Sequence, residues 1–333
     1  MNRGIHPHIV LSFVLISLLS GCIKTESSDG QPPVDTQQST LSSERNRVIL
    51  SFSGERLPPK SFEGQERQKR ERQLNEAREL YENNPDSLEA IIWYGRRLGY
   101  LGLYYDAVDI YTDGLRIFPN SYKLLRHRGE AHITVRQFAQ ARQDLEQAVF
   151  FSRDAPNEPE PDGQPNRLNK PLRSTKFNIW YHLGLTYYLQ GNFDKAISAY
   201  KKCMEVSDND DLKVATTTWL YRTYFQIGNM EEADRLLETI DPGMRIVESR
   251  SYHNILMLFK NEVTPQRIRE LASRRDESLD PTIGYGLGNW YVLNGDVAVA
   301  TETFDQVLSS GNWDSFGYIA SEVERSNLDV SPL

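Results

Sequence analysis

A repeat of about 34 residues constrains this chain more than any other feature of its sequence. Segments beginning at Ile91, Ile179 and Tyr285 resemble one another when the sequence is aligned on itself. The repeats start at Leu88, Tyr122, Phe177, Val214 and Pro281. Position 8 then holds Gly95, Gly129, Gly184 and Gly288, and position 20 holds Ala107, Ala141, Ala196, Ala233 and Ala300. Alanines in the same phase in every repeat indicate a regular array.

The small residues indicate helices that pack closely in pairs. Two helices cross closely where the side chain at their contact is no larger than a methyl group. Large residues at position 24 would fill the space beside that contact, namely Tyr111, Leu145, Tyr200, Leu237 and Phe304. Position 15 holds Gly102, Gly191, Gly228 and Gly295, as is typical just beyond a helix C-terminus. The pattern predicts a series of helical hairpins.

These positions resemble those of the tetratricopeptide repeat, a helical hairpin that stacks into a solenoid. The resemblance covers residues 63–325 and implies an all-α, right-handed α-solenoid of about five to six repeats plus capping helices. The repeats lie near 88–121, 122–155, 177–210, 214–247, 248–280 and 281–314. The fifth is degenerate, with Ile255, Leu258 and Leu271 at positions 8, 11 and 24. A charged helix over 64–83 and a closing helix with Phe316, Ile319, Ala320 and Val323 on one face would cap the ends, leaving 326–333 as a tail.

One interval between repeats is too long. The starts at Tyr122 and Phe177 are 55 residues apart, and the excess falls in a proline-rich stretch over 154–175. Prolines at this density break helices, so we expect an inserted loop.

The N-terminus is typical of a targeting segment. Residues 9–19 form an apolar run that is too short to span a bilayer, and Arg3 precedes it. The sequence Leu19-Ser20-Gly21-Cys22 then resembles a bacterial lipobox, which implies a signal peptide over 1–21 and a lipid on the Cys22 sulfur. The alternative is an ordinary secretory peptide that happens to end in cysteine. Residues 22–62 would form a polar, flexible linker after the lipidated Cys22.

Composition and motifs exclude several classes of function. A formal charge of −8 does not favour a nucleic-acid binder. The chain has only two cysteines, too few for a Cys-based zinc site, and the second, Cys203, falls at a small core position. Phosphate-binding loops and hydrolase motifs are absent from the sequence. We therefore expect no enzyme activity, no metal and no cofactor.

One helix carries an unusual concentration of basic residues. Arg128 and His132 fall at core positions 7 and 11, where a structural ion pair with Asp113 or Asp144 would explain them. Lys123 and Arg126 fall at positions 2 and 5, which face the concave groove in this repeat family. The sequence therefore predicts that Lys123 and Arg126, like Arg96 at position 9 of the first repeat, are exposed, and that Arg128 is buried and paired.

Other groove positions complete a candidate binding surface. The candidates from all repeats are Arg96, Tyr100, Lys123, Arg126, Asn178, Tyr181, His182, Tyr285 and Asn289. Basic groups at one end, with Tyr, Asn and His beyond them, suit an extended acidic or carboxylate-bearing ligand. A merely solvated groove is the alternative for the same residues.

Together these features predict a membrane-anchored, non-catalytic scaffold that binds a protein or peptide partner in its groove. The lipid would hold it in a bacterial cell envelope. Ile23 lacks the aspartate that retains enteric lipoproteins in the inner membrane, so the outer membrane, facing the periplasm, is the expected place. A lipoprotein that captures a glycan or another small nutrient is the alternative.

Overall fold

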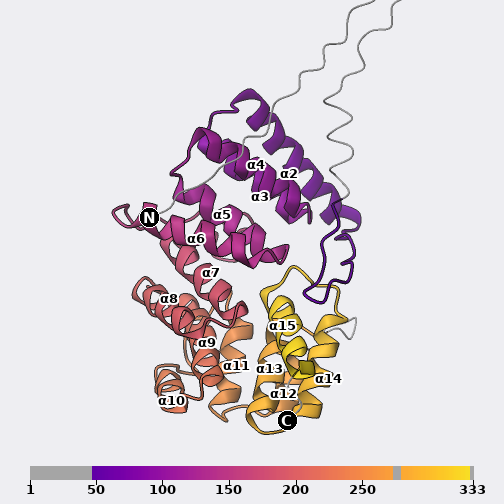
Figure 1. Ribbon diagram of the computed structural model, residues 1–333, viewed down its shortest axis with the longest axis vertical. Coiled ribbons are helices and arrows are strands. Elements are labelled where there is room, and N and C mark those ends of the chain that lie inside the picture. The colour runs from indigo at the N-terminus through magenta and orange to yellow at the C-terminus, as the bar shows by residue number, and fades with distance from the viewer. Residues whose placement is uncertain (1–46, 273–278, 331–333) are drawn as a thin grey trace, which may run out of the picture. The chain divides into compact units, whose positions relative to one another are not determined.

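The predicted all-α fold is confirmed. The computed structural model describes residues 47–272 and 279–330, which form fourteen helices and no strand (Figure 1). The helices are α2 (Gly64–Asn83), α3 (Leu88–Tyr100), α4 (Tyr104–Ile117), α5 (Tyr122–Thr134), α6 (Phe138–Ser152), α7 (Thr175–Leu189), α8 (Phe193–Glu205), α9 (Asp210–Gln226), α10 (Met230–Glu238), α11 (Arg250–Phe259), α12 (Pro265–Ala272), α13 (Pro281–Leu293), α14 (Val297–Leu308) and α15 (Phe316–Val330). The signal peptide, Cys22 and most of the predicted linker lie outside the described residues.

Consecutive helices pair as antiparallel hairpins from α3–α4 to α13–α14, and each hairpin packs on the next. The small residues lie where their helices meet. A Cβ atom added to Gly184 would lie 2.6 Å from Cε1 of Tyr200, and one added to Gly288 would lie 2.3 Å from Cε1 of Phe304. The position-20 alanines are at most 1% exposed. Positions 8 and 24 therefore form the close contact in the four hairpins that have glycine at position 8.

Helix ends follow from local sequence. The side chains of Ser87, Ser121, Ser174, Asn209 and Asp280 each accept a hydrogen bond from a backbone N–H in the first turn of the following helix. These bonds satisfy donors that the helix itself leaves free. The hairpin turns place Gly102, Gly191, Gly228 and Gly295 at φ between +69° and +82°, where glycine has no steric penalty.

The fifth hairpin differs from the prediction in its second helix. Leu271, expected in the core at position 24, is 45% exposed, whereas Ile268 and Ala272 are buried. The buried face of α12 is formed by Ile268 and Ala272, an i, i+4 pair, and Leu271 lies outside it.

The two ends of the described chain differ from the predicted linker and tail. Ile49 is buried, and the indole Nε1 of Trp313 donates to the Pro58 carbonyl oxygen at 2.8 Å, so residues 47–62 pack against the helical body. Helix α15 continues to Val330 and does not end at residue 325. It packs on α13 and α14, and Glu324 accepts hydrogen bonds from Tyr188 of α7 and Gln226 of α9.

The close contact in α7–α8 generates a stability prediction. Gly184→Leu would force a side chain into the Tyr200 ring and should destabilise the protein by about 1–3 kcal/mol or more. Gln190→Leu, at an exposed position after the same helix, serves as the control and should change stability little. Urea unfolding followed by far-ultraviolet circular dichroism measures both, and equal shifts would contradict the assignment.

Candidate functional site

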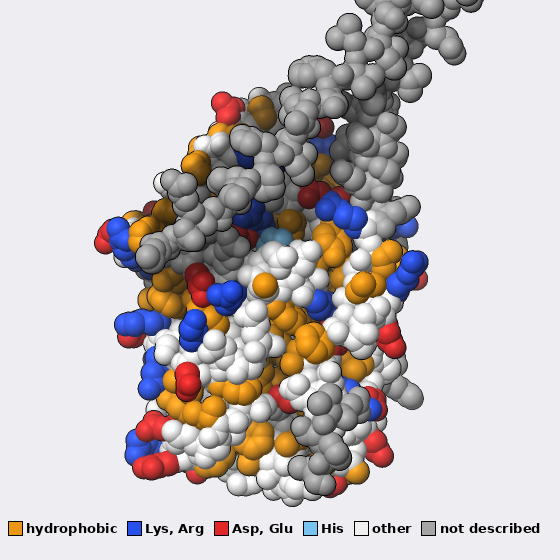
Figure 2. Space-filling view, in the orientation of Figure 1, with side chains coloured by type: hydrophobic (Ala, Val, Ile, Leu, Met, Phe, Trp, Pro, Cys, Tyr) orange, Lys and Arg blue, Asp and Glu red, His pale blue; other side chains and the backbone are white. Residues whose placement is uncertain are grey.

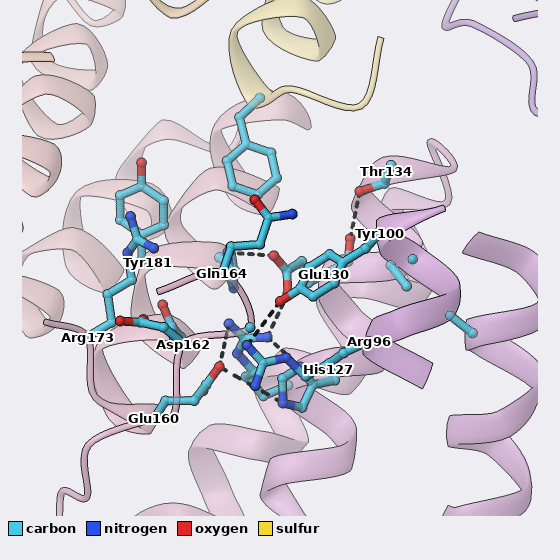
Figure 3. Close-up of a pocket in the computed structure, with 18 of the residues that line it drawn as sticks. Arg96, Tyr100, His127, Glu130, Thr134, Glu160, Asp162, Gln164, Arg173 and Tyr181 are labelled. Atoms are coloured by element: carbon cyan, nitrogen blue, oxygen red, sulfur yellow. Dashed lines mark hydrogen bonds and ion pairs between the residues drawn. The ribbon is translucent and has the colours of Figure 1, made fainter. Parts of the chain in front are cut away.

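A cavity of about 610 Å³ lies on the groove side of α3, α5 and α7. The loop between α6 and α7 (residues 153–174) forms one wall, and Glu248, Tyr252, Asp314 and Phe316 close the other sides. We call this space the groove cavity. Figure 3 shows Arg96, Tyr100, Glu130, Asp162 and Tyr181 around it. On the face in Figure 2, basic and acidic side chains gather around a histidine in the upper half.

Six of the nine predicted groove residues line the cavity: Arg96, Tyr100, Arg126, Asn178, Tyr181 and His182. The other three do not. Tyr285 is fully buried, with its ring against Trp219 and Phe304, and Asn289 donates to the Tyr285 carbonyl oxygen at 2.7 Å. In this repeat α15 packs on α13, so positions that would face an open groove lie inside the core.

Arg126 is buried, which corrects the prediction that it is exposed. Arg126 is only 5% exposed. Nη1 lies 2.6 Å from Oε2 of Glu130 on the same helix, and Nη2 lies 2.9 Å from Oε1 of Glu160 in the inserted loop. Burial alone would lower the pKa of the guanidinium, but Glu130 and Glu160 raise it above its ordinary value. The loop therefore covers Arg126 and supplies half of its counter-charge.

Arg128 forms the predicted ion pair. Its Nε and Nη2 donate to the two carboxylate oxygens of Asp144, both at 2.7 Å. The Asp144 side chain is 5% exposed and that of Arg128 is 20% exposed, so Arg128 is paired as predicted but only partly buried. The other proposed partner, Asp113, pairs with Arg116.

The inserted loop also reaches the other basic groups. Lys123 remains partly exposed and lies 3.0 Å from Oε2 of Glu158. Arg96 donates to the Pro161 carbonyl oxygen at 2.8 Å, and Arg97 donates to the Gly163 carbonyl oxygen at 3.0 Å. Sequence reasoning missed these loop residues. The alternation of Glu and Pro over 158–161 was the available signal, because it marks an extended acidic segment.

The lining of the groove cavity carries more acidic than basic side chains, whereas the prediction placed basic groups at one end and named no acidic residue there. Its lining includes three arginines, Arg96, Arg126 and Arg173, and five carboxylates, Glu130, Glu160, Asp162, Glu248 and Asp314. Burial, opposed by Glu130 and reinforced by Arg126, lowers the pKa of His182 to about 3. Burial would raise the pKa of Glu130, but Arg126 and His182 lower it to about 2. At neutral pH the cavity thus offers a neutral imidazole beside an ionised carboxylate.

Other chemistry has less support in the described residues. Cys203 is fully buried, and burial raises the pKa of its thiol to about 12, so it packs as a core residue. Between residues 47 and 330, apart from the gap at 273–278, no group of His, Cys, Asp or Glu is arranged to hold a metal ion. Within the same ranges, no helix is both long and apolar enough to cross a membrane.

Comparison with known proteins identifies the repeat type. Residues 177–210, which contain α7 and α8, match the tetratricopeptide repeat family. BBSome complex member BBS4 of Bos taurus is 24% identical over 151 residues, which are 45% of this chain and 24% of that protein. The chain thus spans about a quarter of that relative.

Three solved structures are similar at low identity. A tetratricopeptide repeat protein from Parabacteroides merdae is 14% identical, with 78% of this chain and 80% of that one covered and a TM-score of 0.43. MamA is 16% identical, with 61% and 100% covered and a TM-score of 0.40. YrrB, described as a tetratricopeptide repeat protein with an unusual peptide-binding site, is 12% identical, with 74% and 97% covered and a TM-score of 0.40.

The shifted groups in the cavity predict acid sensitivity. The pKa of His182 is about 3 in the folded protein and about 6.5 when unfolded, so below pH 6.5 the unfolded chain binds a proton that the native state excludes. Stability should fall as pH falls, by about 1.4 kcal/mol per pH unit for this group between roughly pH 5.5 and 4. His127, whose pKa burial also lowers, acts in the same direction.

Urea unfolding at a series of pH values tests this dependence. His182→Gln removes one titrating group and should reduce the slope of unfolding free energy against pH by about 1.4 kcal/mol per unit. An unchanged slope in a folded His182→Gln protein would show that His182 is not held neutral.

Proposed function

We propose that this tetratricopeptide-type helical scaffold is a non-catalytic adaptor that binds a segment of a partner protein at the groove cavity. The observation that carries the proposal is the cavity itself, about 610 Å³ in volume and lined by residues from several repeats and from the inserted loop. Charged groups with fixed geometry line it, and such groups provide orientation and specificity in a binding site.

The lining favours a peptide over a glycan. Sugar binding uses exposed aromatic faces, but the aromatic rings here pack on one another. The Tyr181 ring stacks on Phe177 at 5.4 Å between centroids, and the Tyr111 ring stacks on His127 at 5.8 Å. Guanidinium and carboxylate groups, by contrast, match the backbone and charged side chains of a peptide.

We further propose that the adaptor is anchored in a bacterial cell envelope through a lipid on Cys22, at the outer membrane and facing the periplasm. The support is the sequence Leu19-Ser20-Gly21-Cys22 directly after an apolar run. Two or three acyl chains on one cysteine would give stable membrane attachment.

Site-specific photocrosslinking in cells tests partner binding. A benzophenone amino acid at Gln164, which is exposed and lines the cavity, should crosslink a discrete partner. The same amino acid at Phe150, which is 56% exposed and lies outside the cavity lining, is the control and should not. Equal crosslinking at both positions, or none at Gln164, would contradict a site at the cavity.

Metabolic labelling with a fatty-acid analogue tests the anchor. Cys22→Ala should abolish lipid labelling and leave the precursor uncleaved, because the sulfur is the proposed attachment point. Undiminished labelling of the Cys22→Ala protein would contradict lipidation at this residue.

A further inference from the structure

An acidic segment of the inserted loop lies on basic residues of α3 and α5. We call Glu158–Gly163 the acidic segment, and we call Arg96, Arg97, Lys123 and Arg126 the basic face. The acidic segment places one carboxylate on Lys123 and one on Arg126, and its backbone carbonyl groups accept from Arg96 and Arg97. Every cation of the basic face therefore contacts the acidic segment.

The spacing of the two charged pairs matches between segment and helix. Lys123 and Arg126 are three residues apart on α5, which puts them about 5–6 Å apart on one helix face. Glu158 and Glu160 are two residues apart, and alternate residues of an extended chain lie on the same side about 6.5 Å apart. Glu158 and Glu160 each precede a proline, which favours extended backbone, and the segment forms a β-bridge in which the Glu160 N–H donates to the Arg173 carbonyl oxygen at 2.9 Å. The basic face thus fits carboxylates at alternate positions of an extended peptide.

We propose that the basic face is a docking surface for an extended acidic peptide of a partner protein, and that the acidic segment occupies it in cis. This inference rests on the proposed adaptor function and names the chemistry of the partner. The partner peptide carries two carboxylates at alternate positions, with proline or another extended residue between them.

The energetics of the loop favour exchange. Between residues 154 and 174 only Glu160 and Gly163 are buried, so burial of apolar side chains does not hold the loop in place. An added Cβ at Gly163 would lie 1.8 Å from the Tyr100 hydroxyl oxygen, which shows that the segment touches the face closely without inserting a side chain. Ion pairs and hydrogen bonds hold it, and a peptide with the same groups can replace them.

Arg126 has a second carboxylate partner besides the loop residue Glu160. Its Nη1 bonds Glu130 on the same helix, so the guanidinium keeps a carboxylate partner when Glu160 leaves. With the acidic segment on the basic face, Nε of Arg126 and Oε2 of Glu160 are still buried without a hydrogen-bond partner. The cis segment therefore does not satisfy the face completely, and a partner peptide can do so better.

Peptide binding to a loop-released variant tests the proposal. Glu158→Gln with Glu160→Gln removes the two carboxylates that pair with Lys123 and Arg126 and leaves Asp162 in place. A fluorescent peptide of residues 157–166, NEPEPDGQPN, should bind this variant at least tenfold more tightly than the unaltered protein, and the affinity should fall with added salt. The peptide NQPQPDGQPN should not bind. Adding Lys123→Gln to the variant should weaken peptide binding by up to about fivefold, the contribution of one exposed ion pair.

A matched control removes a carboxylate of similar exposure elsewhere. The Glu71 side chain is 48% exposed and pairs with Arg67, whereas that of Glu158 is 49% exposed. Glu71→Gln should leave peptide affinity unchanged. Circular dichroism verifies folding of each variant. If the double variant loses helix content, the single variant Glu158→Gln is compared with the unaltered protein instead. The proposal is overturned if peptide affinity does not rise in that variant.

The outcomes separate this inference from the proposed function. Absence of peptide binding to the folded, loop-released variant overturns the inference, as does equal binding of the two peptides. If Gln164 still crosslinks a partner in those cases, the adaptor function stands without it. Binding of NEPEPDGQPN that competes with the crosslinked partner supports both.

Discussion

Four of the helical hairpins depend on a large side chain at position 24 that lies on a glycine at position 8 of the facing helix. Tyr111 on Gly95 and Tyr200 on Gly184 are two examples, and a methyl group at either glycine would overlap the ring. This contact fixes how closely the two helices of a hairpin approach. Because the contact recurs, the same positions of successive first helices lie on one side of the array, and the groove cavity forms there.

The repeated part of the fold could be predicted because its signals are local and recur. The helices that cap the two ends were predicted as well, but their contacts with the rest of the body were not, because those contacts join residues far apart in the sequence. Arg136 occupies the turn position that is glycine in four other repeats, with φ of 61°, a conformation that costs a non-glycine residue about 1–2 kcal/mol. Its guanidinium bonds both oxygens of Glu322 at 2.9 Å, and both side chains are 5% exposed. In the sequence Arg136 was only another basic residue near α5.

The sequence predicted which repeat positions line the candidate site, but it did not predict the carboxylates that lie among its basic groups. Periodicity placed Arg96, Tyr100, Tyr181 and His182 correctly at the cavity, because their repeat positions face it. The same positions predicted an exposed Arg126, because the prediction assumed an open groove. The loop that covers Arg126 has no period, and its path depends on contacts such as that between Asn166 and Glu248, 82 residues apart. Local sequence does not specify such contacts.

The acidic segment also determines which contacts a partner peptide must make to displace it. A tethered competitor acts at an effective concentration on the order of millimolar, so a peptide with only the same two carboxylates gains little over it. The exposed pair of Lys123 and Glu158 contributes at most about 1 kcal/mol and weakens in salt. Selectivity therefore depends on the buried contact at Arg126 and on further contacts inside the cavity, where Glu130 and Tyr252 line the wall. A partner that reaches both regions can replace the loop, whereas a simple anion cannot.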